Sequence, residues 1–547
     1  DVVFGIDAGI EVRENAKLLA YNSVFRPCDD IETWKGIAFI EGVLGIEGSI
    51  KECTFINAEV AVNIEQTINT NEVAEVELKN NLFTNCYLGL RVNYEVAEPN
   101  IQVSGNTFEW GDWDHISYNI LPADLNFVGI ELRNTGESNT RYFHPITQNN
   151  FANNTNYGSV FQNHSVGGIL VYTGNADVDA SNNQFTNLDY AFKAIADSEV
   201  GNPKISFENN FIEVTRRSNK DINYQVEITR AEPNFSTVAY ISGNTIVNSA
   251  VVDATLLEPT RPFFNNALVG TGAIYSNNSA HIVDNYVRGF EVGIFADGSA
   301  VGEGTQPIRI SNNKIESFIY GIYRRGFTNV THTIITCNEI DMKQTQDEES
   351  INSVGICYQI QVAPGYSTRT RSYTNPSLGF ISDNCVSNTD MAIQIVNSSN
   401  VAGGNRLPPS LHVENNFMQN YHRTGFDIHD FEHDGANGEF VRRNTFFSNN
   451  KVNGAIDIGR TVNFVAAAGT AFDIHGNDYG STAVAWTNVN IRSNNVEPSS
   501  ATCAGQDAGE ESSLNFVDCN DEDILGETLT PTEMVTLNGG TSVVTTN

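Results

Sequence analysis

Short alternations of apolar and polar residues run along most of the 547-residue chain, and a turn signal interrupts them at intervals. Ile308 and Ile310 alternate with polar residues before one such turn, and Ile315 and Phe318 do so after it. A period of two is typical of β-strands, because successive side chains point to opposite faces. No stretch keeps a period of 3.6 for the roughly 10 residues that a helix needs. The pattern therefore predicts an all-β protein.

The turn signal is itself a repeat. It consists of a polar residue, then a small residue or Asn, then Asn, then any residue, then a large apolar residue, as in SNNKI ending at Ile315. Successive markers lie 25 to 46 residues apart. Looser members are Asn22, Cys53 and Asn150. The clear markers are Asn81, Asn106, Asn183, Asn210, Asn244, Asn285, Asn313, Asn338, Asn384, Asn416, Asn444 and Asn477.

A second signal keeps a fixed distance from the first. About eight residues after a marker stands a small residue followed by an apolar one, as in Gly89-Leu90 and Gly293-Ile294. Short strands with an Asn at each turn predict a parallel β-solenoid of about 15 rungs, in which each strand pairs with its counterpart one rung away. Asn suits such turns because it tolerates left-handed backbone geometry, and stacked Asn amides can form a ladder.

These features resemble the right-handed parallel β-helix proteins of the pectate-lyase-like superfamily, in particular the Asn-rich repeats of large secreted bacterial surface proteins. The resemblance covers residues 1–497, and right-handed parallel crossovers are independently preferred. It implies a fold and no single function, because this fold hosts both enzymes and adhesins. The repeat stops near Glu497, so residues 498–547 are expected to form a linker and the start of a separate β-rich module.

Enlarged segments break the repeat at defined places. Those after Asn106, Asn150 and Asn338 follow a marker directly and are expected to leave from one corner of the solenoid. Excursions near 217–237, 256–275 and 359–378 lie before the next marker and are expected to leave from a different corner. The first residues already alternate like a rung, with no polar cap before them, so we expect an internal piece of a longer protein.

The charge excludes several classes of partner. Lys and Arg number 31 against 66 Asp and Glu, which gives a net charge of −35. Such a surface repels nucleic acids and anionic lipids, and no apolar run approaches the ~18 residues of a membrane-spanning helix. Cys503 and Cys519 enclose a polar loop and are expected to form a disulfide, which together with the acidity and the Asn content favours an oxidising, extracellular compartment. The resemblance to secreted surface proteins implies a place at a cell surface.

The other cysteines leave alternatives open. Cys53 occupies a marker position and Cys86 lies close to the next marker, so they form either a cross-rung disulfide or two small buried thiols. The same alternatives hold for Cys337 and Cys385.

One candidate site follows from aligning the strands that come after the small residue. The alignment gives an outward column Phe295, Tyr323, Cys357, Gln394, Asp427, Asp457 and, two residues on, a column Asp297, Arg325, Gln359, Val396, His429, Gly459. Carboxylates one rung apart lie ~5 Å from each other, close enough for coupled titration or cation binding. We therefore consider Asp427, His429 and Asp457 as catalytic candidates, and Asp427, Asp430 and Asp457 as ligands for calcium. The alternative is a solvated polar face on an acidic chain.

A second candidate lies in the segment EWGDWDHISYN. Trp113-Asp114-His115 resembles the Trp-x-Asp-His element of pectate lyases with the spacer missing, but the calcium carboxylates and catalytic Arg of that family cannot be placed. Trp110, Trp113, Asp114 and His115 either contact a sugar or protein ligand or anchor the loop. Asn388-Thr389-Asp390 matches one polygalacturonase element, whose companion motifs are absent.

Three functions remain. The first is a non-enzymatic structural or adhesive module of a large secreted surface protein, acting as a stiff stalk or filament subunit beside neighbouring domains or protomers. The second is a secreted polysaccharide lyase or glycoside hydrolase acting on the β-helix face. The third is a carbohydrate-binding or calcium-dependent adhesion module that contacts a polysaccharide or a target cell surface.

Overall fold

The computed structural model describes the solenoid and leaves the C-terminal segment outside its scope. The expected module at 498–547 and its Cys503–Cys519 disulfide therefore lie outside the described residues. The chain divides into two compact units, 1–251 and 252–547. The described residues are 1–13, 16–29, 33–40, 47–66, 74–94, 100–111, 127–134, 143–154, 165–172, 177–196, 205–215, 223–230, 239–249, 271–277, 280–298, 308–327, 333–342, 353–361, 378–397, 410–430, 445–448, 451–455, 460–466, 472–475 and 484–487.

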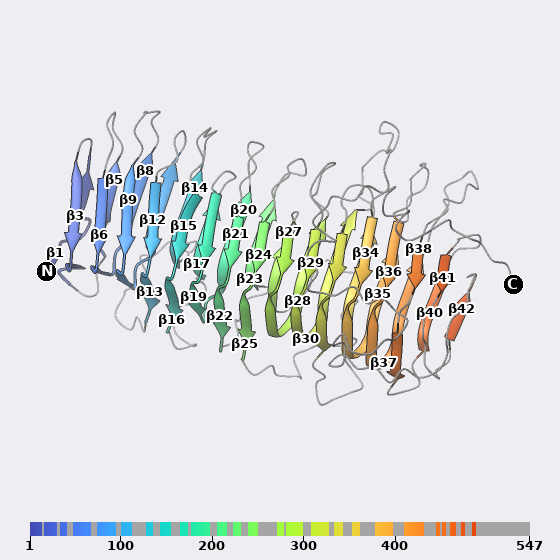
Figure 1. Ribbon diagram of the computed structural model, residues 1–547. Coiled ribbons are helices and arrows are strands. Elements are labelled where there is room, and N and C mark those ends of the chain that lie inside the picture. The colour runs from blue at the N-terminus through green and yellow to red at the C-terminus, as the bar shows by residue number, and fades with distance from the viewer. Residues whose placement is uncertain are drawn as a thin grey trace, which may run out of the picture. The chain divides into compact units, whose positions relative to one another are not determined.

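Every regular element in the described ranges is a β-strand, and the strands of each unit lie side by side in parallel stacks (Figure 1). We name the stacks by their place in a rung: stack A precedes the marker position, stack B follows it, and stack C follows stack B. In the first unit, stack A consists of β3 (Lys17–Tyr21), β6 (Glu47–Lys51), β9 (Glu75–Lys79), β12 (Asn100–Ser104), β15 (Phe143–Thr147), β18 (Asp177–Ser181), β21 (Ile205–Glu208) and β24 (Ala239–Ser242).

Stacks B and C of the first unit complete each rung. Stack B consists of β1 (Val2–Phe4), β4 (Val24–Pro27), β7 (Thr54–Ile56), β10 (Leu82–Thr84), β13 (Thr107–Trp110), β16 (Asn150–Asn153), β19 (Gln184–Thr186), β22 (Phe211–Val214) and β25 (Thr245–Asn248). Stack C consists of β2 (Gly9–Val12), β5 (Gly36–Ile40), β8 (Val60–Gln66), β11 (Leu88–Tyr94), β14 (Phe127–Asn134), β17 (Val166–Tyr172), β20 (Tyr190–Ala196) and β23 (Asn223–Arg230).

The second unit repeats this plan, with several strands that run from stack B into stack C without interruption. Stack A consists of β27 (Ala280–Val283), β29 (Ile308–Ser311), β31 (Thr333–Thr336), β34 (Leu378–Ser382), β36 (Ser410–Glu414), β38 (Thr445–Ser448) and β41 (Phe472–His475). The continuous strands are β28 (Tyr286–Gly298), β30 (Lys314–Phe327), β35 (Cys385–Asn397) and β37 (Phe417–Asp430). The others are β32 (Glu339–Met342) and β39 (Lys451–Ala455) in stack B, and β26 (Thr271–Ser276), β33 (Val354–Gln361), β40 (Arg460–Ala466) and β42 (Val484–Thr487) in stack C.

All strand pairs within a unit are parallel and join one rung to the next, as in β10 with β13 and β30 with β33. Parallel pairing of successive rungs is the defining property of a β-solenoid. The predicted parallel β-helix is therefore confirmed as the architecture of the described residues.

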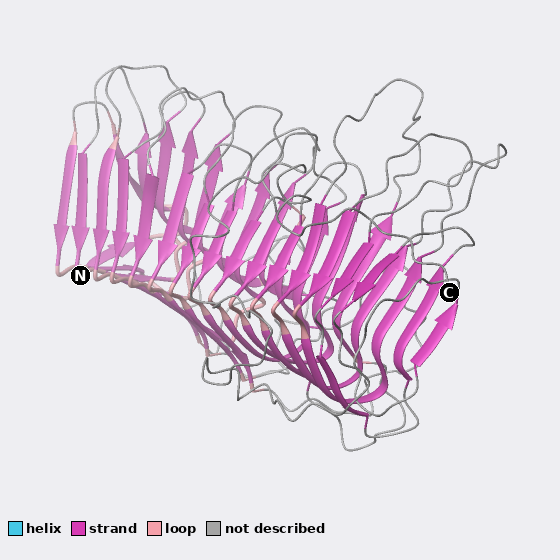
Figure 2. Ribbon diagram, turned by 45° about the vertical axis from the view of Figure 1, so that its right-hand side comes forward, coloured by secondary structure: helices cyan, strands magenta, loops and turns pink. Residues whose placement is uncertain are grey.

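Two consecutive residues make the tight turn between stacks A and B, which Figure 2 draws as short pink links. The first residue adopts the left-handed conformation, for example Asn182 with φ 56° and Asn312 with φ 55°. The second is the marker, and its side chain is buried, as for Asn183 and Asn313. The left-handed backbone and the stacked amide, which the repeat pattern predicts for a single Asn, are thus divided between two residues.

The buried marker amides form a continuous ladder within each unit. The Nδ2 of each Asn donates to the Oδ1 of the next, at 3.1 Å for Asn149 to Asn183 and 2.9 Å for Asn313 to Asn338. That Oδ1 also accepts the backbone N–H of the preceding Asn, and Nδ2 donates as well to a carbonyl one rung back, such as Ile146 for Asn183. Because the donors and the acceptor are all used, the amides are stable in a buried position.

The ladder corrects three predicted markers. Asn149, buried to 1% exposure, is the ladder residue, and Asn150 is the first residue of β16. Asn22 has φ 48° and is therefore the left-handed residue before the ladder position. Asn444 precedes β38 of stack A instead of following such a strand. Asn477 lies outside the described residues, as does Asn444 itself, whereas the other ten clear markers are confirmed in ladder positions.

Aromatic rings fill the interior of the first unit beside the ladder. Stack B places a Phe two residues after the ladder position in successive rungs, and neighbouring ring centroids lie 4.6 to 5.0 Å apart, as expected from the ~4.8 Å spacing of strands. A Cβ on Gly129 would lie 2.5 Å from the Phe151 ring. This contact explains the small residue of the second signal. The rings belong to Phe25, Phe55, Phe83, Phe108, Phe151 and Phe185.

The corners of the coil were predicted in part. The segments after Asn106 and Asn150 in the first unit and after Asn338 in the second each connect stack B to stack C of their own unit, so they belong to one type of corner as expected. Segment 362–377 connects β33 of stack C to β34 of stack A, which agrees with the different corner predicted for the excursion near 359–378. The prediction that 217–237 is a single excursion at that corner is wrong, because β23 of stack C lies inside this range. The same prediction for 256–275 is wrong as well, since the chain enters stack C within this range, at β26.

Candidate functional site

The first predicted column lies on stack C of the second unit, and its register is correct as far as Asp427. Phe295 pairs with Tyr323, Tyr323 with Cys357, Cys357 with Gln394, and Gln394 with Asp427. These positions alternate with core residues such as Ile294 and Ile322, so they belong to the other side of the strands. Contrary to the expectation of an exposed face, Phe295 and Tyr323 are 6% and 7% exposed.

The buried part of this face holds a polar cluster in which opposite charges are paired. Arg325 forms an ion pair with Asp297, and its guanidinium lies 5.3 Å from the centre of the Phe295 ring. The Tyr323 hydroxyl donates to the Gln359 side chain, while Phe295 and Tyr323 stack at 4.8 Å between centroids. Burial raises the pKa of the Tyr323 hydroxyl, which keeps it protonated. A neutral phenol and a neutralised carboxylate suit a stabilising role better than a proton-transfer role.

The strand alignment behind the predicted catalytic set is wrong at its last rung, whereas the catalytic roles of Asp427, His429 and Asp457 stay a prediction. In β37, Asp427 pairs with Asn463 of β40, and His429 pairs with Val465. Asp457 is therefore not the strand partner of Asp427, and Gly459 does not follow His429 in the second column. The alignment failed because Gly454-Ala455, which anchored it, belongs to β39 of stack B. Asp457 itself and the side chains of Asp427 and His429 lie outside the described residues.

The calcium hypothesis stays a prediction. Among the described residues no group of three or more His, Cys, Asp or Glu side chains has the arrangement of a metal site. Asp427 and Asp430 are placed only by their backbone in β37, and Asp457 is outside the described ranges.

Of the aromatic candidate site at the first enlarged segment, only Trp110 belongs to the described residues. Trp110 is the last residue of β13 and is 2% exposed, with its indole N–H donating to the Cys86 carbonyl at 2.9 Å. Its burial and its hydrogen bond favour the alternative in which this residue anchors the start of the segment. Trp113, Asp114 and His115 lie outside the described residues.

The described cysteines settle the first alternative in favour of thiols, because Cys53 and Cys86 are buried and form no disulfide. Cys337 carries a thiol too, so it is not joined to Cys385, which is itself disulfide-bonded. Cys53 takes a ladder position, where its backbone N–H donates to Asn81 Oδ1 at 2.9 Å. Burial raises the pKa of the Cys86 thiol to about 12, so it remains protonated and unreactive.

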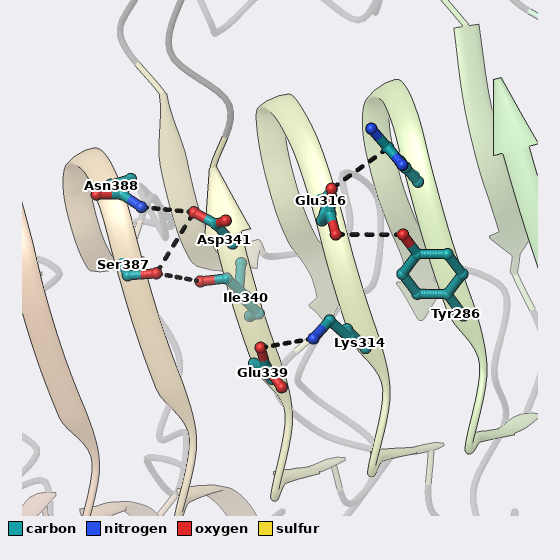
Figure 3. Close-up of polar contacts among 9 residues, drawn as sticks. Tyr286, Lys314, Glu316, Glu339, Ile340, Asp341, Ser387 and Asn388 are labelled. Atoms are coloured by element: carbon teal, nitrogen blue, oxygen red, sulfur yellow. Dashed lines mark hydrogen bonds and ion pairs between the residues drawn. The ribbon is translucent and has the colours of Figure 1, made fainter. Parts of the chain in front are cut away.

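The outer side of stack B in the second unit carries polar side chains that bond from rung to rung (Figure 3). Lys314 Nζ lies 3.0 Å from Glu339 Oε1, and the Tyr286 hydroxyl donates to Glu316 at 3.2 Å. On the next rungs, Asn388 Nδ2 donates to Asp341 Oδ1 at 2.7 Å. This side is a solvated face whose charges are partnered within the sheet, and such exposed pairs stabilise only weakly.

Asp297 and Arg325 both stand in the second predicted column, but their pairing is not among the predictions from sequence. Their opposite charges at the same position of neighbouring strands were the available signal. The burial that makes the pair important could not be read from alternation.

Comparison with known proteins adds no relative. No protein-family model, no curated protein and no solved structure matches this chain. In the described part of the chain, no helix has the length and apolar character needed to cross a membrane.

Proposed function

We propose that this chain is a non-enzymatic structural and adhesive module, a stiff spine that serves a large secreted surface protein as a stalk or filament subunit. The observation that carries the proposal is the amide ladder, whose buried donors and acceptors are bonded from rung to rung in each unit. Such a ladder resists sliding between rungs, because a shift would leave buried amides without partners.

The polar cluster around Arg325 supports the same role. Its charges are neutralised by each other, and its phenol is hydrogen-bonded and held protonated. Catalysis at the surface of a solenoid requires an acid or base that is free to exchange a proton with a substrate.

The experiment measures stiffness and turnover on the same preparation. Single-molecule stretching is expected to give high unfolding forces in a stepwise pattern, as rungs detach one after another. Incubation with neutral and acidic polysaccharides should release neither reducing ends nor unsaturated products. Turnover that disappears in Asp427→Asn but persists in the surface variant Glu339→Gln would reject the structural role in favour of a polysaccharide lyase or hydrolase.

A further inference from the structure

The outer side of stack A in the first unit carries a hollow that is lined mainly by polar side chains. It has a volume of about 360 Å³ and spans β3, β6, β9 and β12. Both Gly48 and Val76 line it at its base, while the side chains around it are polar. The same four strands follow one another in Figure 1, so the hollow runs across successive rungs.

The register orders the lining residues in two rows. In the first row Lys17 pairs with Glu47, Glu47 with Glu75, and Glu75 with Asn100. The second row is Leu19, Ser49, Glu77 and Gln102. With ~4.8 Å between strands, each row presents a side chain at every step over roughly 14 Å.

The two rows offer hydrogen bonds in both directions. The Glu47, Glu75 and Glu77 carboxylates accept, whereas the amides of Asn100 and Gln102 both donate and accept. Among the described residues, none forms a hydrogen bond or ion pair with the Glu75 carboxylate, and Glu75 lies one strand away from Glu47. Like charges at this distance repel, so hydroxyl groups that donate to both carboxylates would relieve an unfavourable pair.

An apolar edge lies next to the polar rows. Leu19 lines the hollow and is 66% exposed, and Tyr21, two residues further along β3, is 65% exposed. An exposed aliphatic and an exposed aromatic side chain beside a polar hollow provide a surface for the C–H face of a sugar ring.

Charge decides which extended ligand suits the hollow. Glu47 is paired with Lys17, and Lys51 lies 2.6 Å from Glu77, so two of the three carboxylates are already neutralised. The other polar groups, Glu75, Asn100 and Gln102, can form hydrogen bonds with a ligand, but they carry too little negative charge to favour a polycation. An acidic polysaccharide would be repelled by the Glu75 carboxylate and by the net charge of −35.

We propose that the hollow on β3, β6, β9 and β12 binds an extended neutral polysaccharide that lies across the rungs, with its hydroxyls on the two polar rows and a ring face on Leu19 and Tyr21. The site gives the adhesive part of the proposed function a class of ligand and rests on that part alone; it is independent of the stiffness, because a stiff spine needs no ligand. Its loss would therefore leave the mechanical result unchanged.

The experiment uses the intact chain in affinity gel electrophoresis and calorimetry. The probes are dextran, mixed-linkage β-glucan and galactomannan, with polygalacturonate and polylysine for comparison. Ser49→Trp fills the hollow from the second row, Gln102→Ala removes an amide, and Glu213→Gln on β22 of stack B is the matched control. Thermal unfolding of each variant verifies that it is folded.

We expect at least one neutral polysaccharide to bind and to remain bound at about 0.5 M NaCl, where exposed charge pairs are screened. Ser49→Trp should weaken this binding by about tenfold or more, Gln102→Ala by severalfold, and Glu213→Gln not at all. The proposal is overturned if no neutral polysaccharide binds, or if Ser49→Trp and Gln102→Ala both bind like the unaltered chain. Binding of polylysine alone, lost at high salt, would equally overturn it and mark a cationic-peptide site.

Discussion

At the scale of single residues, the turn between stacks A and B depends on a pair of neighbours with different tasks. The first residue needs a left-handed backbone, which Asn, Asp and Gly adopt most easily, and it is Asn209, Gly243 or Asp383 in different rungs. The second needs a side chain with both amide donors and an acceptor, and this is why Asn recurs there. Substitutions at the two positions should therefore fail for different reasons.

The ladder position is expected to be far more sensitive than its neighbour. Asn149→Ala removes an amide that bonds Asn106, Val103 and Asn183, which leaves buried groups without partners at about 1 to 3 kcal/mol for each lost bond. We predict a loss of roughly 3 kcal/mol or more in the free energy of unfolding, measured by denaturant titration.

The matched control is the next residue. Asn150→Ala changes a half-buried side chain of β16 outside the ladder, so its effect should stay within about 0.5 kcal/mol. Equal losses for the two variants would contradict the assignment of Asn149 to the ladder.

The turn residue Asp383 predicts a pH effect. Burial raises the pKa of its carboxyl to about 6, above its ordinary 3.8. The folded state thus holds the proton more tightly, so the free energy of unfolding falls as the pH rises from about 4 to about 6 and stays lower above that. Asp383→Asn should remove this loss, raising the free energy of unfolding by roughly 1 to 3 kcal/mol at about pH 7.5 and little at about pH 4.

Denaturant titrations at the two pH values test this expectation. Asp284→Asn is the matched control, since Asp284 has the same left-handed conformation with φ 58° but is exposed. A gain in Asp383→Asn that is equal at both pH values would argue against a titrating carboxyl as the cause.

At the scale of elements, strands of different stacks fit together because small residues face large ones. Gly89, Gly129 and Gly168 of stack C each approach a ring of stack B, with 2.4 to 2.7 Å between the ring and a built Cβ. In the second unit, Gly321 has the same relation to Ile340. The small residue therefore fixes how closely stacks B and C can meet.

This contact gives an element-scale prediction. A Cβ on Gly129 would also lie 2.9 Å from the Gly168 carbonyl, so Gly129→Ala should destabilise the protein by about 1 to 3 kcal/mol. Phe151→Leu introduced together with it should cost less than the sum of the two single changes, as a double-mutant cycle would reveal.

Gly111→Ala is the control for this cycle. The nearest atom to a Cβ there is Asn85 Oδ1 at 4.0 Å, and the backbone N–H that Gly111 donates to it is retained. A loss comparable to that of Gly129→Ala would show that glycine flexibility, and not the ring contact, determines the effect.

At the scale of the whole molecule, each unit holds its own ladder and its own apolar interior. The first unit packs a column of Phe rings, and the second fills the same column with Val287, Ile315, Ile340, Val386 and Met418. Because solenoid stability is a sum over rungs and their interfaces, a unit does not depend on distant rungs for its core.

The first unit should consequently fold by itself. A fragment of residues 1–251 is expected to keep the far-ultraviolet circular dichroism of β-structure and to unfold cooperatively. Its slowest amide hydrogen exchange should be at the ladder N–H groups, such as those of Asn149 and Asn183. A fragment without cooperative unfolding would mean that the second unit is needed for stability.

Local chemistry explains which features the sequence by itself determined. Strand periodicity, the Asn turn and the small residue before each apolar one are set by neighbours along the chain, and they determined the parallel β-helix and ten of the twelve clear ladder positions. They also placed Phe295, Tyr323 and Gln394 in one column, since unbroken strands carry the register across the repeat.

Only the tertiary structure decided the features that depend on adjacent rungs. It chose Asn149 over Asn150, because only a residue in line with Asn106 and Asn183 can bond both amides. Pairing along the whole of β37 set Asn463, and not Asp457, beside Asp427. The burial of the Asp297–Arg325 pair and the hollow on β3, β6, β9 and β12 likewise depend on side chains that are remote in sequence. Alternation along one strand carries no information about such side chains.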